Sequence, residues 1–351
     1  MQWFQLYEID ASLLASVMQA LGEQFPHYAI FAPSDYDLLI VASDRPIPLP
    51  VKDSVFQQPG LAQEMFRVYA LTAGDLDARY LGSRATLEPL FASYGMPLNS
   101  DYYPVLDLNA AKQRFLERSA SDVVAMLSAA VPVLEMLEPD LPRRPVNPLH
   151  KGAHAFERIE QTRLARYARD VLLKPTLPEP EAISTLLEKD LELVKLRLIE
   201  CRDPKEQDVW LHSLLNVARL VNPYLPAPEA SAVWARVAAA PCFATLREYQ
   251  RQWVLLYAAV AQRDGPHGAV LAAWLLANQP DLSRESREYL LMAGMAGALA
   301  AKDPGRALAL WNEYHGKIRN EARPVFRLLR CHAQRSEPAA CASSFARYAD
   351  D

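Results

Sequence analysis

The stretch that organises the N-terminal region is residues 2–43, QWFQLYEIDASLLASVMQALGEQFPHYAIFAPSDYDLLIVAS. Its aromatic-rich start favours a strand over residues 2–8. Asp10 is then expected to cap a helix, because apolar residues follow at positions 13, 14, 17, 18 and 21, the spacing of one helix face. Two apolar runs at 27–31 and 38–41, joined by a loop containing Pro, Ser and Asp, predict a β-hairpin. The expected order is therefore strand, helix, hairpin.

The rest of the chain is predicted to be helical. Residues 45–59 hold four prolines and are expected to form an irregular crossing. From residue 61 the apolar spacing becomes helical, and helices are predicted at 61–71, 75–80, 86–94, 109–117, 120–137, 153–173, 179–201, 205–221, 228–239, 244–263, 267–278, 283–301, 304–318 and 322–335. The expected fold class is α+β overall and mainly α.

A faint repeat runs through the second half of the sequence. Alanines 230, 269 and 307 lie 39 and 38 residues apart, and each is followed four or five positions later by a tryptophan, at 234, 274 and 311. A small residue followed by a large one on the same helix face is typical of stacked helical hairpins. The pattern predicts an all-α, TPR-like helical-hairpin domain, with an irregular helical bundle as the alternative.

Composition excludes several classes of function. The 351 residues include 37 Lys+Arg and 42 Asp+Glu, a net charge of −5, with no Lys/Arg block of the kind that binds nucleic acid or an anionic membrane. The 12 glycines form no nucleotide-binding loop. No apolar run approaches the length of a membrane span and the N-terminus lacks a basic start, so a cytoplasmic location is expected. The four cysteines are scattered without a CxxC pair and are expected to be reduced, mostly buried thiols.

Residue chemistry alone assigns neither a catalytic residue nor a metal ligand. His150 and His154 have the i, i+4 spacing of a helical ligand pair, but the intervening residues lack the glutamate of HExxH, so a solvated helix start is favoured. Cys331 and His332 are adjacent, and neighbouring helical side chains point about 100° apart, which favours core packing over a nucleophile and base.

The N-terminal third resembles a known family. The order of elements in residues 2–43, with Phe25-Pro26 before the hairpin, resembles the C-terminal end of the catalytic domain of bacterial spermidine synthase-like proteins. A second stretch, residues 99–107, NSDYYPVLD, resembles their "N(S/T)DD.P.LE" segment, with Tyr102 where the second Asp is usual. The resemblance covers about residues 1–112.

This resemblance implies a domain organisation. Residues 1–112 would be the end of a methyltransferase-like Rossmann sheet without its cofactor half, and 113–148 a helix and proline-rich linker. Residues 149–351 would be the helical, repeat-like domain. The family's cofactor is decarboxylated S-adenosylmethionine and its substrate a polyamine. By resemblance, Gln2 and Tyr36 are the substrate-binding residues.

Two functions follow as hypotheses. In the first, the chain is part of an aminopropyltransferase and is inactive alone, because the family's cofactor loop and catalytic Asp match nothing in this sequence. In the second, the chain is a non-enzymatic helical-repeat module that binds a protein partner.

Overall fold

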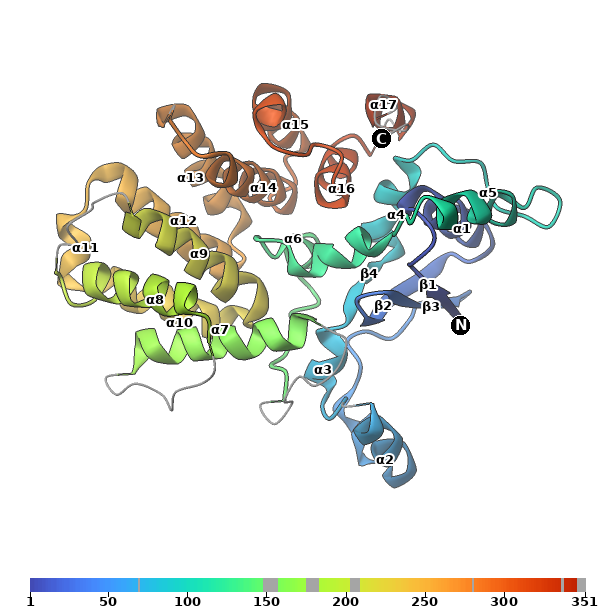
Figure 1. Cartoon of the computed structure of the whole chain (residues 1–351), viewed down its shortest axis with the longest axis horizontal. Coiled ribbons are helices and arrows are strands. Elements are labelled where there is room, and N and C mark those ends of the chain that lie inside the picture. Colours follow the sequence, from blue (N-terminus) through green and yellow to red (C-terminus); the bar gives the residue numbers. More distant parts are fainter. Residues whose placement is uncertain are drawn as a thin grey trace.

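The computed structural model describes residues 1–68, 70–147, 157–174, 183–202, 209–279, 281–335 and 338–345. In chain order its elements are β1 (Gln2–Gln5), α1 (Ala11–Gln24), β2 (His27–Ser34), β3 (Asp37–Ser43), η1 (Asp53–Gln57), α2 (Pro59–Arg67), α3 (Ala73–Asp77), β4 (Tyr80–Ser83), α4 (Arg84–Ala92), α5 (Val105–Phe115), η2 (Ser121–Ser128), α6 (Val133–Leu137), α7 (Glu157–Leu173), α8 (Thr185–Leu198), α9 (Val209–Tyr224), α10 (Ala227–Ala238), α11 (Pro241–Thr245), α12 (Glu248–Gln262), α13 (Gly265–Asn278), α14 (Arg284–Ala300), α15 (Pro304–Tyr314), η3 (His315–Lys317), α16 (Pro324–Ala333) and α17 (Pro338–Phe345). A small sheet near the N-terminus is followed by many helices, so the expected mainly helical α+β class is confirmed (Figure 1).

The sheet is antiparallel throughout, with strand order β1-β3-β2-β4. Alternate residues of the hairpin face one side, and those at positions 28, 30, 32, 38 and 40 are buried. Helix α1 begins where predicted, because the Asp10 carboxylate accepts a hydrogen bond from the amide of Leu13 at 2.9 Å. Its residues at positions 13, 14 and 18 are buried, the spacing of one helix face. The predicted strand, helix and hairpin are thus confirmed.

Three local predictions need correction. The strand β4 lies between two predicted helices, and a run of four residues is too short to show a period in the sequence. The helix predicted over 120–137 is two elements, η2 and α6, because Pro132 lies between them and cannot continue a helix. The sequence also gave no indication of α17.

Helices α9, α10 and α12 to α16 pack against their neighbours in succession, and the last of them returns to the N-terminal part of the chain. Helix α16 packs against α4 and η2, and the Arg327 side chain donates to the Ser93 carbonyl at 3.4 Å. Figure 1 shows α6 in the middle of the molecule, between the sheet and the helices that follow it. One continuous apolar core therefore joins both ends of the chain.

The prediction that the cysteines are reduced is wrong, since all four form disulfides in this structure. Cys201 is bonded to Cys242 and Cys331 to Cys341, with Cα–Cα distances of 5.0 and 5.5 Å. Those distances lie within the range that a disulfide bridges. Sequence spacing could not show this, because the first pair is 41 residues apart and only the packing of α8 near α11 brings the two together.

The proline-rich stretch is fastened at several points over its described residues, 139–147. Arg144 holds both oxygens of the Asp77 carboxylate, at 2.7 and 2.8 Å. The amide of Asn147 donates to the Asp75 carboxylate at 3.0 Å. Just before this stretch, Glu138 accepts from the Tyr80 hydroxyl at 2.9 Å and from the Ser83 amide at 3.0 Å. The stretch is therefore tied to α3 and β4.

A buried carboxylate connects α6 to this stretch and to the helical part. Glu135, 8% exposed, lies 3.5 Å from the guanidinium of Arg143 and 3.0 Å from that of Arg263. Arg263 also donates to the carbonyl of Leu225 at 3.2 Å. Burial lowers the pKa of Arg143, and the Glu135 carboxylate beside it opposes this shift.

We expect Glu135→Gln to lower the free energy of unfolding by about 3–5 kcal/mol, because a neutral amide leaves two buried guanidinium groups without a counter-charge. The measurement is urea denaturation followed by circular dichroism. The matched control is Glu64→Gln, whose partner Arg67 and own side chain are 66% and 62% exposed. The control is expected to change stability by about 0.5 kcal/mol or less. Equal losses in the two variants would contradict the role given to Glu135.

Candidate functional site

Gln2 and Tyr36, the substrate-binding residues expected from the resemblance, lie at opposite ends of β1. Gln2 pairs with Ile40 across the sheet, and its side-chain amide donates to the carbonyl of Trp3 at 2.8 Å. Tyr36 is in the hairpin turn, 54% exposed, and its carbonyl accepts from the amide of Leu6 at 2.8 Å. Four strand residues separate these ends, about 13 Å at the rise of a β-strand. Both side chains are exposed, and the structure does not bring them together.

A pocket of about 280 Å³ lies elsewhere, between η2, α9, α14 and the start of α16. Its lining comes from four parts of the chain that are distant in sequence: Asp122, Ala125, Met126, Ser128, Ala129, Ala130, Arg219, Glu285, Glu288, Tyr289, Met292, Arg323, Pro324 and Val325. The pocket exists because α14 packs on α6 and α16 packs on η2, which leaves a gap between the four segments.

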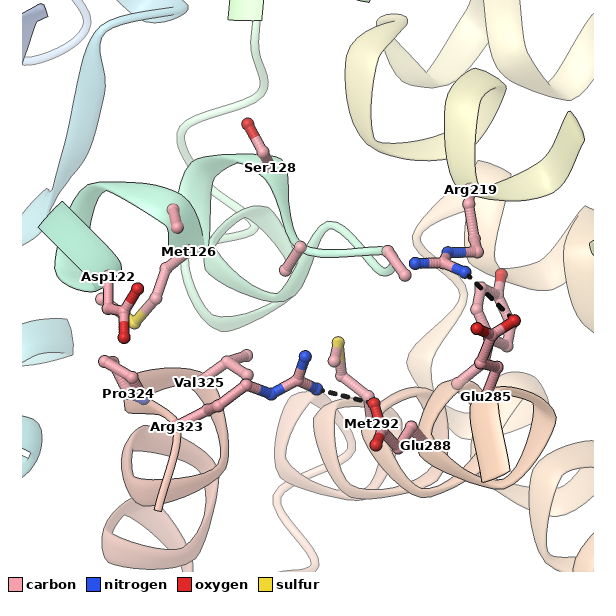
Figure 2. A pocket seen from close by; sticks show the side chains of 14 residues that line it. Asp122, Met126, Ser128, Arg219, Glu285, Glu288, Met292, Arg323, Pro324 and Val325 are labelled. Carbon is pink, nitrogen blue, oxygen red and sulfur yellow. Dashed lines mark hydrogen bonds and ion pairs between the residues drawn. The ribbon is translucent and has the colours of Figure 1, made fainter. Parts of the chain in front are cut away.

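Two arginines enter the pocket from opposite sides, each beside a glutamate of α14 (Figure 2). Arg323 donates to the Glu288 carboxylate at 3.0 Å, and that carboxylate also accepts from the amide of Arg319 at 2.9 Å. Arg219 lies 3.8 Å from Glu285, beyond hydrogen-bond distance. The first pair is therefore held firmly, and the second is a loose, half-exposed ion pair.

The floor of the pocket is apolar. Met126, Met292 and Tyr289 line it and are buried. The Tyr289 hydroxyl accepts from the Asn222 amide at 3.4 Å, and burial raises the pKa of this phenol well above its ordinary value, so it is neutral at pH 7. Charged groups around an apolar floor recognise a ligand by its charge and hydrocarbon, which is the chemistry of a binding site.

The other candidate groups carry no catalytic geometry. Cys331 is buried and in a disulfide, and the half-buried His332 has its Nε2 2.7 Å from the Thr86 carbonyl, so this pair packs against the core as expected. His150 and His154 lie outside the described residues. Within the described ranges, no three His, Cys, Asp or Glu residues are grouped so that they could hold a metal ion.

A search of those same ranges also finds no helix with the length and apolar character to cross a bilayer. Comparison with models of protein families, with curated proteins and with solved structures found no match to this chain.

Sequence reasoning did not find the pocket. Its charged residues Asp122, Arg219 and Arg323 belong to no motif in the sequence. No local pattern could have shown that they lie around one pocket, because they are remote in sequence. Asp122 is in η2, Arg219 is in α9 and Arg323 directly precedes α16.

We expect the free energy of unfolding to depend on the protonation of His332. Burial lowers its pKa, although the hydrogen bond to Thr86 opposes the shift. The unfolded chain, with a histidine pKa of about 6.5, therefore takes up this proton first as the pH falls. Stability should decrease from about pH 6.5 downward, toward the folded pKa.

His332→Gln keeps a donor for Thr86 but cannot titrate, so its unfolding free energy should fall less than that of the wild type between about pH 7 and pH 5. Urea denaturation at several pH values measures the difference. The control is His212→Gln, at an exposed position of α9, which should follow the wild type. If His332→Gln loses as much stability as the wild type over this range, His332 is not the group responsible.

Proposed function

We propose that residues 1–112 are the terminal part of a spermidine synthase-like Rossmann sheet, and that the chain takes part in aminopropyl transfer only together with a cofactor-binding half. The observation that carries this proposal is the outer edge of β1. Within the described part of the chain, Gln2–Gln5 pair with β3 on one side and with no strand on the other.

The surroundings of β1 support this proposal. Trp3 is 53% exposed on the strand. An edge strand with an exposed aromatic side chain is ordinarily covered, because its free amide and carbonyl groups invite another strand. Past the end of β1, residues at 119 and 120 bond to Leu6, so only the stretch over Gln2–Gln5 is open to a neighbour.

The loop that resembles the family's "N(S/T)DD.P.LE" segment connects two helices of the N-terminal region. The Asn99 side-chain oxygen accepts from the backbone amide of Leu106 at 2.8 Å, and the Asn99 backbone amide donates to the carbonyl of Ser16 at 3.3 Å. Asn99 thus holds the start of α5 against α1. Tyr102, at the position where the family has an aspartate, is 98% exposed.

On this proposal the two halves divide the reaction. The cofactor-binding half would supply the glycine-rich loop for decarboxylated S-adenosylmethionine and the aspartate that takes the proton from the attacking amine. This chain would supply the wall on the polyamine side, with Gln2 and Tyr36 exposed where a ligand can reach them. The amine would attack the methylene next to the sulfonium, so that a C–N bond forms as the C–S bond breaks, and the neutral thioether would leave with the electron pair of that bond.

We expect the chain alone to form no spermidine from putrescine and decarboxylated S-adenosylmethionine. Joined before Gln2 to the cofactor half of a bacterial spermidine synthase, it should form spermidine. In that fusion Gln2→Ala should lower kcat/KM by about tenfold, the loss expected of one hydrogen bond to substrate. Gln5→Ala, another exposed glutamine of β1, should not. A fusion that is folded and binds the cofactor yet makes no spermidine would refute the proposal, as would activity of the chain alone.

A second function is favoured by the burial of the repeated residues. Ala230, Ala269, Ala307, Trp234 and Trp311 are all buried in the helical core, as stacked TPR-like hairpins require, and Trp274 is half-buried. We propose as the alternative that residues 149–351 form a helical-repeat module that binds a protein partner.

If that module is independent, a fragment of residues 149–351 should melt cooperatively in circular dichroism and resist limited proteolysis. Its melting temperature should be lower than that of the full chain, since the contacts of α14 with α6 and of α16 with α4 are lost. A molten, rapidly degraded fragment would exclude the module.

The cytoplasmic location stays a prediction. Disulfides persist mainly in oxidising compartments, so the two cysteine pairs bear on this question directly. Cell fractionation followed by thiol counting would decide it.

A further inference from the structure

The pocket between η2, α9 and α14 contains donors that the protein leaves unused. The guanidinium of Arg219 makes no hydrogen bond within the described ranges, and its nearest carboxylate is 3.8 Å away. The second arginine, Arg323, donates to Glu288 through a terminal nitrogen and has a partly exposed side chain. A guanidinium group with unused N–H donors favours a ligand with acceptor oxygens between the two arginines.

The pocket also holds a carboxylate without a counter-charge. Asp122 is exposed at the mouth, beside Met126 and Pro324, and has no hydrogen bond or ion pair among the described residues (Figure 2). The lining contains two arginines against three acidic residues, which leaves one negative charge in excess. A simple anion would add to that excess, whereas a ligand with one positive and one negative group would not.

The space between these charges suits hydrocarbon. The buried side chains of Met126, Met292 and Tyr289 form the floor, and a volume of about 280 Å³ is below that of a pocket for a drug-sized ligand. A small molecule with an apolar body fits both the size and the lining.

We propose that this pocket binds a small zwitterion, an aliphatic amino acid. Its carboxylate lies between the guanidinium groups of Arg219 and Arg323, its ammonium group lies at Asp122, and its hydrocarbon packs on Met126 and Met292. Binding leaves the net charge of the pocket unchanged and supplies acceptors to the guanidinium group of Arg219. The site is separate from β1 and does not depend on aminopropyl transfer.

Isothermal titration of the full chain tests the ligand class. Two probes are used, L-leucine for an α-amino acid and 6-aminohexanoate for an ω-amino acid. For each, one analogue lacks the amine (4-methylpentanoate, hexanoate) and one lacks the carboxylate (3-methylbutylamine, hexylamine). At least one of the two amino acids should bind, and the affinity for each of its analogues should be lower by about tenfold or more. The proposal is overturned if neither amino acid binds at about 10 mM, or if an analogue binds as tightly as its parent.

Substitutions then assign each end of the ligand. Asp122→Asn should lower the affinity for the amino acid that binds by about tenfold. It should leave the affinity for the analogue without the amine unchanged. Arg219→Gln should lower the affinity for the amino acid and leave the affinity for the analogue without the carboxylate unchanged. The matched controls are Asp107→Asn and Arg236→Gln, at exposed positions outside the pocket, which should bind as the wild type does. Circular dichroism verifies folding of all variants, and a loss of affinity in the controls equal to that in the pocket variants would overturn the assignment.

Discussion

The buried carboxylate of Glu135 joins parts of the chain that are 128 residues apart. It lies between Arg143, from the proline-rich stretch, and Arg263, from the end of α12. Removing a charge from water is costly, so once these groups are buried together neither sign can remain without the other. Arg263 also has a left-handed backbone, φ 60°, a conformation that costs a side-chain-bearing residue about 1 kcal/mol. Glycine would avoid that cost, but only a long cationic side chain can reach Glu135.

The groups around Glu135 extend this connection to the sheet. Asp75 and Asp77 hold the proline-rich stretch against α3, and Glu138 holds the end of α6 against β4. A guanidinium buried nearby, that of Arg158, is stabilised in another way: it donates to the carbonyl of Pro223 at 2.8 Å and lies over the ring of Tyr224. Because the stretch is fastened on both sides, the sheet and the helices share one core.

The pocket is a consequence of the same arrangement. Element η2 directly precedes α6, and α14 packs on α6, so the position of Glu135 decides how η2 faces α14. The return of α16 to α4 and η2 then brings Arg323 to the remaining side. A binding site formed in this way uses residues that have no relation in the sequence. Its charged residues therefore come together only when the core has formed.

Predictions were correct where the interactions that support them act over a few residues, and wrong where those interactions join remote segments. The hairpin and α1 were predicted because their signals, alternating burial and the Asp10 cap, act over a few residues. The short β4 was missed because its pairing with β2 is remote, across about fifty residues of sequence. The cysteines were misjudged for the same reason, since Cys201 and Cys242 meet only after α8 has packed near α11.

By itself, the sequence determined the strand, helix and hairpin of residues 2–43 and the mainly helical class. Tertiary structure alone decided the free edge of β1, the pairing of the cysteines, the partners of Glu135 and the meeting of Asp122, Arg219 and Arg323 around one pocket. The physical reason is the separation in sequence between the residues that interact. Helical and strand periodicity is set by neighbours within one or two turns, whereas ion pairs, disulfides and cavities depend on separations that exist only after remote segments pack.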